Sequence, residues 1–167
     1  MEGLTASLDL LARWGHILGV LVWMGHNFAN FIQRPSFRPL TPGESPEARF
    51  SAAMRREHAT FRHASLVTLA TGIYLLWYRG LMVDALTLSG RGMVIGLGVW
   101  LGLLMVANLW LVLWPHQRKV LGYVAAPADE RIRCSRITFL SSRTNTILAF
   151  PTLFFMAAGA HGFAGFH

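Results

Sequence analysis

The stretch RWGHILGVLVWMGHNF, residues 13–28, places His16 and His26 in a run with one basic residue and no acidic residue. The run belongs to a longer apolar segment, residues 10–31, that only Arg13 interrupts. About 20 apolar residues, each rising about 1.5 Å, carry a helix across a bilayer. The stretch therefore predicts a membrane-spanning helix. The two imidazoles indicate functional residues, because lipid offers a polar side chain no partner.

Three more segments are free of charged residues, at residues 64–78, 92–114 and 144–160. Of the 167 residues, 14% are charged, against about 25% in ordinary soluble domains. A soluble bundle would need far more charge on its outer faces. The sequence predicts an all-α fold, an integral membrane four-helix bundle forming one domain over residues 1–167. Its helices are expected over about residues 8–32, 58–79, 92–114 and 138–161, with loops over 33–57 and 115–137.

The basic residues are distributed unevenly along the chain. Eleven Lys and Arg residues lie within residues 34–62 and 118–136, and three, Arg13, Arg79 and Arg91, lie toward the opposite side. Positive charge is retained on the cytoplasmic side of membrane proteins, so both long loops are expected in the cytoplasm and both termini outside it. A multi-pass protein of the bacterial inner membrane fits this pattern. Anionic lipid headgroups account for the net charge of +7, and nucleic acid is not expected as a partner.

This orientation sorts the histidines into two levels. His16 and His161 belong to the outer halves of their helices, and an inner group comprises His26, His58, His63 and His116. Two imidazoles from different helices at one level can bind a haem iron, one on each face, and helix bundles commonly hold such cofactors. His16 with His161 is the expected iron-binding pair, and His26 with His63 is the second choice.

Several side chains have simpler interpretations. His58 and His167 are expected to be solvated or to lie at the membrane interface. His63 and His116 could equally be residues of helix ends. Arg143 opens the fourth helix, where its partner would be a haem propionate or a lipid headgroup.

Non-covalent haem b, in one or two copies, is the cofactor that suits this composition best. The sequence contains no CxxCH motif for covalent attachment. Zinc and copper fit less well, because the helices lack acidic and thiolate ligands and the histidines are divided between two levels. The single cysteine, Cys134, excludes an internal disulfide and falls in a predicted loop.

Three passages resemble the amino-terminal membrane domain of the bacterial membrane-bound urate oxidase (urate hydroxylase) family. They are residues 13–28, NLWLVLWPHQRKVLG at residues 108–122, and SSRTNTILAFPTLFFMAAGAHG at residues 141–162. The chain looks like a short four-helix version of that domain. The resemblance implies a helical membrane domain that handles electrons with haem b. His16, Arg143 and Asn145 occupy matching positions, whereas His26 and His116 are inferred from this sequence alone.

The expected function is that of a membrane cytochrome b-like protein that transfers electrons. Its partner would be a c-type cytochrome or a larger respiratory or oxidase complex. Two alternatives stay open: an oxidoreductase that acts alone on a urate-like or porphyrin-like molecule, and a structural or transport subunit without a cofactor. The candidate cofactor-binding residues are His16, His26, His63, His116, His161, Arg143 and Asn145.

Overall fold

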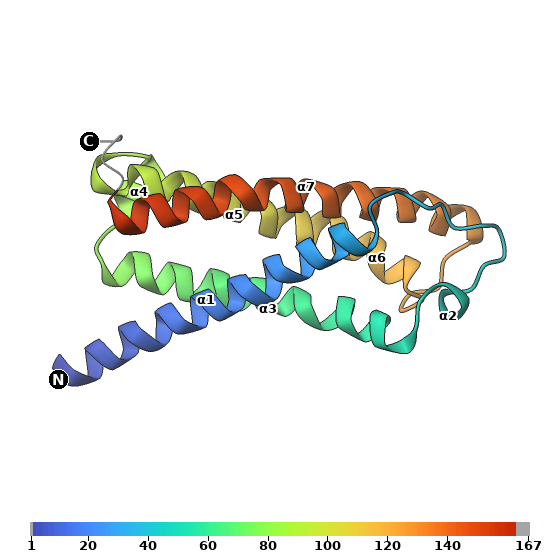
Figure 1. The fold of residues 1–167 in the computed structure, drawn as a ribbon, viewed down its shortest axis with the longest axis horizontal. Helices are drawn as coiled ribbons and strands as arrows, with labels where there is room; N and C mark the ends of the chain where they lie inside the picture. The colour runs from blue at the N-terminus through green and yellow to red at the C-terminus, as the bar shows by residue number, and fades with distance from the viewer. Residues whose placement is uncertain (1, 163–167) are drawn as a thin grey trace.

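The computed structural model describes residues 2–162, and every regular element in this range is helical (Figure 1). The long segments are α1 (Glu2–Gln33), α3 (Ala52–Tyr78), the rod Gly90–Val120 and α7 (Ala128–His161). Two short helices, α2 (Pro46–Arg49) and α4 (Met82–Thr87), lie in the connections. The rod consists of a 3₁₀ turn (Gly90–Gly92), α5 (Met93–Ala107), a π-helical segment (Asn108–Leu113) and α6 (Trp114–Val120).

The prediction of an all-α fold is confirmed, but the helices are longer and the loops shorter than expected. α3 begins at Ala52, six residues before the predicted start, and α7 begins at Ala128 instead of near residue 138. α6 occupies the first part of the loop predicted over residues 115–137. These additional turns are rich in arginine, so they lie outside the charge-free runs from which the helices were predicted. Ser51 caps α3 by accepting a hydrogen bond from the Met54 N–H at 3.2 Å.

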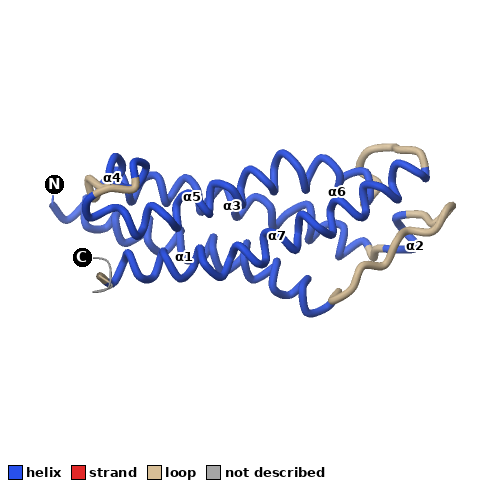
Figure 2. Tube along the Cα trace, turned by 90° about the horizontal axis from the view of Figure 1, so that it is seen from above, coloured by secondary structure: helices blue, strands red, loops and turns tan. Residues whose placement is uncertain are grey.

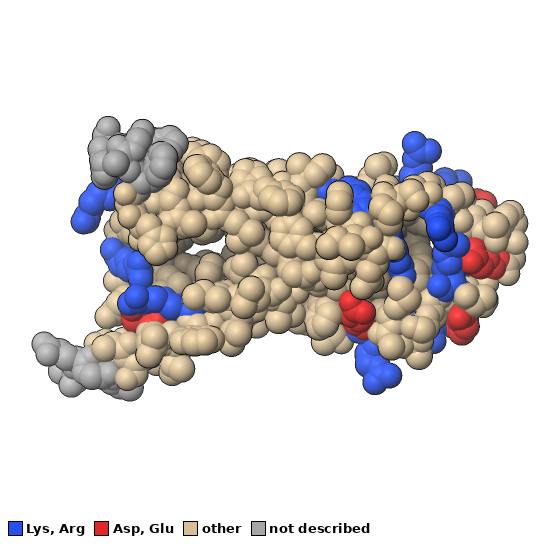
Figure 3. Space-filling model, viewed as in Figure 1, with Lys and Arg blue, Asp and Glu red and all other residues tan. Residues whose placement is uncertain are grey.

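The long segments form two antiparallel pairs, as Figures 1 and 2 show. α1 packs along α3, and α5 packs along α7. The pairs meet toward the end that carries α2, where α1 also contacts α7. Toward the opposite end, where α1 begins and α7 ends, they diverge and leave an opening that is visible in Figure 3.

Two apolar clusters hold the arrangement together. The larger joins both helix pairs and contains Trp23, Met24, Met105, Leu109, Leu113 and Ala149. The smaller, at the α2 end, contains Leu40, Phe50, Val120, Leu121 and Cys134. Cys134 is therefore a buried helical residue of α7, whereas the sequence placed it in a loop.

The π-helical segment interrupts the rod immediately before Pro115. Proline lacks an N–H and displaces the carbonyl four residues before it, so helices widen or bend near it. Asn108 anchors the start of this segment to α7, because its side-chain Nδ2 donates to Asn145 Oδ1 at 2.8 Å and to Ser141 O at 2.9 Å. The wider turn is thus fixed by polar contacts between two helices.

The outer surface of the described residues carries many large apolar side chains, among them Leu11, Val83, Leu111 and Phe150. By length and composition, one helical segment in residues 2–162 is suited to crossing a membrane, Gly90–Val120. The sequence predicted four such segments. The other three lack charge in their central parts, but tryptophan, threonine, asparagine and histidine make them less apolar.

Candidate functional site

His16 projects from α1 onto α3 and is held there by hydrogen bonds. Its Nδ1 lies 3.0 Å from Thr68 O and 3.2 Å from Thr71 Oγ1. Because a carbonyl oxygen can only accept, Nδ1 carries the proton, and Nε2 of the neutral ring has a free lone pair. Gly72 provides the space, since a Cβ there would lie 3.1 Å from His16 Cε1.

Nε2 of His16 has no hydrogen-bond partner among residues 2–162. An imidazole whose Nδ1–H donates to a backbone carbonyl is the usual arrangement for a histidine that binds a metal through Nε2. This geometry leaves Nε2 available to bind a metal, and the assignment of His16 as a ligand stays a prediction.

His161, the expected partner of His16, lies at the exposed end of α7 in the other helix pair. No contact joins the two side chains in the described structure, because the helix pairs diverge toward this end (Figure 1). The iron-binding pair therefore remains a prediction. His167 lies outside the described residues.

A cavity of about 500 Å³, here called the inner cavity, lies at the other end, where α1, α3, α6 and α7 meet the connection after α1. Lys and Arg side chains gather at this end of the molecule in Figure 3. Five arginines line the cavity: Arg34, Arg38, Arg49, Arg62 and Arg143. In the described part of the chain no Asp or Glu lines it. The cavity is therefore suited to an anion.

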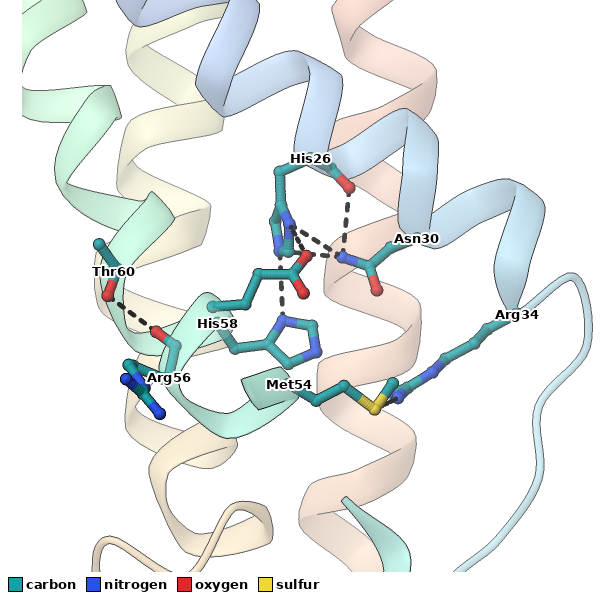
Figure 4. A network of polar contacts seen from close by, with 8 residues as sticks. His26, Asn30, Arg34, Met54, Arg56, His58 and Thr60 are labelled. Atoms are coloured by element: carbon teal, nitrogen blue, oxygen red, sulfur yellow. Dashed lines mark hydrogen bonds and ion pairs between the residues drawn. The ribbon is translucent and has the colours of Figure 1, made fainter. Parts of the chain in front are cut away.

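His26 and His58 form one wall of the inner cavity (Figure 4). His26 Nδ1 lies 3.0 Å from Glu57 Oε1, and His26 Nε2 lies 3.2 Å from His58 Nδ1. The Asn30 amide nitrogen is 2.9 Å from the same Nε2. Because the carboxylate accepts, Nδ1 of His26 donates to Glu57, and in the neutral ring Nε2 accepts from Asn30. This wall therefore has proton-binding groups in direct contact with one another.

The pairing of His26 with His58 differs from the sequence-based expectation. His58 was expected to be solvated or interfacial, and His26 was expected to pair with His63. The His63 ring packs instead against Trp110, with 6.0 Å between the ring centroids. The His116 ring is bonded within its own helix, since Nδ1–H donates to Val112 O at 2.6 Å. Neither of these two imidazoles lines the inner cavity.

Arg143 also lines the inner cavity, and its role in binding an anion stays a prediction. Its guanidinium lies over the rings of Phe31 and Phe139, at 4.5 Å and 4.7 Å from their centroids, and donates to Arg34 O. Asn145 is buried outside the inner cavity. Its Oδ1 accepts from Asn108 and its Nδ2 donates to Met105 O at 3.1 Å, so both ends of the amide are used in helix packing.

The charges around the inner cavity influence one another. Burial, together with the neighbouring positive charge of Arg49, lowers the pKa of the Arg34 guanidinium below its ordinary value. Arg49 pairs with Glu44 at 3.3 Å. The backbone N–H of Thr41 and the charge of Arg49 lower the pKa of the Glu44 carboxyl. Bringing an anion into the cavity would relieve the repulsion among these guanidinium groups.

Three buried donor atoms on the residues that line the inner cavity have no partner in the described structure: Trp23 Nε1, Asn27 Nδ2 and Arg62 Nε. Trp23, Asn27 and Arg34 were not predicted from the sequence as lining residues. Their signal was present in the spacing, because positions 23, 27, 30 and 34 follow one face of α1 at intervals of three or four residues.

A family model described as urate oxidase N-terminal matches residues 51–166. The chain belongs to this family. No curated protein and no solved structure matches this chain. The matched region of this urate oxidase N-terminal domain includes α3 to α7, with Arg143, Asn145 and His161. His16 and His26 on α1 precede it, so their roles depend on the geometry described above.

Proposed function

We propose that this urate oxidase N-terminal protein is a membrane cytochrome b-like domain that binds haem b without a covalent link and transfers electrons. The observation that carries the proposal is the orientation of His16, whose Nε2 is free while its Nδ1–H donates to Thr68 O at 3.0 Å. The residues present therefore fit an axial ligand of haem iron. A bound haem would supply a one-electron redox centre.

The surface supports placement in a membrane. Many large apolar side chains are exposed, and on the face drawn in Figure 3 the charged residues gather toward the two ends of the molecule. We propose a four-helix bundle that crosses the bacterial inner membrane, with the α2 end in the cytoplasm and both termini outside. The excess of basic residues in the two long connections supports this orientation.

His161 is the proposed second axial ligand. It is the last residue of α7, and α7 ends at the end of the molecule where α1 begins (Figure 1). Ligation of one iron by both imidazoles requires the two helix pairs to approach each other at the open end. Haem would thus bridge the α1–α3 pair and the α5–α7 pair. A c-type cytochrome or a larger respiratory or oxidase complex is the proposed electron partner.

The proposal is tested on the full chain purified in detergent. A pyridine haemochrome spectrum with a stoichiometric haem-to-protein ratio, and a low-spin oxidised spectrum, are expected. Turnover of urate by the protein alone would favour an independent oxidoreductase, and a colourless preparation that does not bind added haemin would exclude the cytochrome proposal.

A further inference from the structure

The inner cavity has a chemistry that the haem proposal does not use. We infer that it binds the phosphate group of an anionic phospholipid, whose acyl chains lie on the outer surface beside α1 and α7. This inference rests on the proposed membrane placement and is independent of haem binding at His16.

The charge of the inner cavity favours an anion. Of the five arginines that line it, only Arg49 has a carboxylate within ion-pair distance among the described residues. Arg34 is partly buried, and its Nη2 donates to nothing stronger than Met54 Sδ, at 3.2 Å. Partial burial of positive groups that have no ion-pair partner costs free energy, which a bound anion would offset. Guanidinium groups bind phosphate oxygens through pairs of parallel hydrogen bonds.

Two uncharged hydrogen-bond donors also favour a ligand with acceptor oxygens. Trp23 and Asn27 are 3% and 8% exposed, and Trp23 Nε1 and Asn27 Nδ2 are unpartnered in the structure. Buried donors are nearly always paired, so these two atoms indicate a ligand that brings several acceptor oxygens. The described lining offers no carboxylate that could compete for them.

The neighbouring surface distinguishes a lipid from a small soluble anion. Arg143 lies over the ring of Phe31, which is 45% exposed, and the next residue, Ile32, is 77% exposed. On α7, Leu140 is 54% exposed, three residues before Arg143. The arginines of the inner cavity therefore lie beside an uncovered apolar strip formed by α1 and α7. Basic sites between membrane helices on the cytoplasmic side bind anionic lipid headgroups in this way.

The test uses the full chain in detergent, with lipids removed and then returned as mixed micelles of phosphatidylglycerol or phosphatidylcholine. Bound lipid is measured by native mass spectrometry. Retention of phosphatidylglycerol at least about tenfold above phosphatidylcholine is expected, a factor that corresponds to about 1.4 kcal/mol. Inorganic phosphate at millimolar concentration should not displace the lipid. Displacement would assign the cavity to a soluble phosphate and overturn the inference, as would equal retention of the two lipids.

Variants locate the site. Arg143→Gln and Asn27→Leu should each lower the retention of phosphatidylglycerol, whereas Arg79→Gln, at the opposite end of the molecule, should not. Arg143→Lys keeps the charge and should retain more lipid than Arg143→Gln, which separates binding from misfolding.

Loss of haem together with lipid in Arg143→Gln would assign the cavity to a haem propionate instead. A chain recovered in the soluble fraction would refute the membrane placement, whereas a membrane-bound chain without lipid preference would refute this inference alone.

Discussion

The imidazole of His16 on α1 donates a hydrogen bond from Nδ1 to the backbone carbonyl of Thr68 on α3, across 3.0 Å. A side chain is thus oriented by a backbone atom of the neighbouring helix. Because the carbonyl is part of the helix, the imidazole is held as firmly as the two helices are packed, and its Nε2 is directed by the fold itself.

Replacement of His16 by alanine is expected to abolish the low-spin haem signal, because the proposed axial nitrogen is removed. The change is measured by electron paramagnetic resonance and by the reduced α band. His167→Ala, at the end of the chain, serves as the control and should keep both signals. A low-spin spectrum that survives in His16→Ala would move the ligand assignment to His26.

Gly72→Val should alter the same signal without removing a ligand. Even a single Cβ at this position would lie 3.1 Å from His16 Cε1, so a branched side chain must displace the ring. We expect a shifted haem potential or a high-spin fraction. Gly25→Val is the matched control in the neighbouring helix, since a Cβ there meets nothing within 4 Å. Equal spectra for the two variants would show that the His16 ring does not depend on Gly72.

Asn145→Ala should destabilise the fold and leave haem affinity unchanged in the folded fraction. Asn145 is 1% exposed, and its amide joins Asn108 and Met105 O. Its removal leaves buried polar groups unpaired, at a cost of about 2 kcal/mol. Thermal unfolding followed by circular dichroism gives the loss, with the exposed neighbour in Thr144→Ala as control. An unchanged melting temperature with weakened haem binding would restore Asn145 as a cofactor residue.

The thiol of Cys134 should react slowly with alkylating reagents in the folded protein. Cys134 is 3% exposed, and burial raises the pKa of its thiol. A raised pKa lowers the thiolate fraction at any given pH below it, and the thiolate is the reactive form. Maleimide labelling near pH 7.5 should be at least about tenfold slower than for a free cysteine, whose pKa is about 8.5. Labelling at the free rate would contradict the buried position.

A reporter enzyme fused after His167 should be active outside the cytoplasm. The expectation follows from the concentration of basic residues in the two long connections. A second fusion, between residues 41 and 45, supplies the opposite case and should be active in the cytoplasm. Reversed activities would invert the assignment of outer and inner levels to the histidines.

The long helices could be predicted from the sequence because each contains a run without charge, but their starts could not. The first turns of α3 carry Arg55 and Arg56, and those of α7 carry Arg131 and Arg133, so they resemble loop sequence. Ser51 caps the first turn of α3, whereas α7 has no side-chain cap and its first turns pack against α6 and the smaller apolar cluster. Because α1, α3 and α7 contain charge-free runs, we expected each to be apolar enough to span a membrane. By length and composition, within residues 2–162 this holds for the segment Gly90–Val120 alone.

His16 could be singled out from the sequence because a histidine is unusual in an apolar helix, and its role as a ligand stays a prediction. His58 was expected to be solvated or interfacial, because it follows the charged residues Arg55, Arg56 and Glu57. Its contact with His26 depends on the register between α1 and α3, which a single sequence does not reveal. Asn145 was assigned from a family resemblance, and only the position of Asn108 across the helix interface shows its packing role.

The π-helical segment Asn108–Leu113 has a consequence for how the protein could diversify. A π turn, closed by i→i+5 hydrogen bonds, holds about one residue more than an α turn. Deleting a single residue from this segment would therefore return it to α-helical winding while α6 keeps its direction. Gln117 and Val120 would still line the inner cavity. The same deletion within α6 itself would instead rotate every later residue of that helix by about 100°.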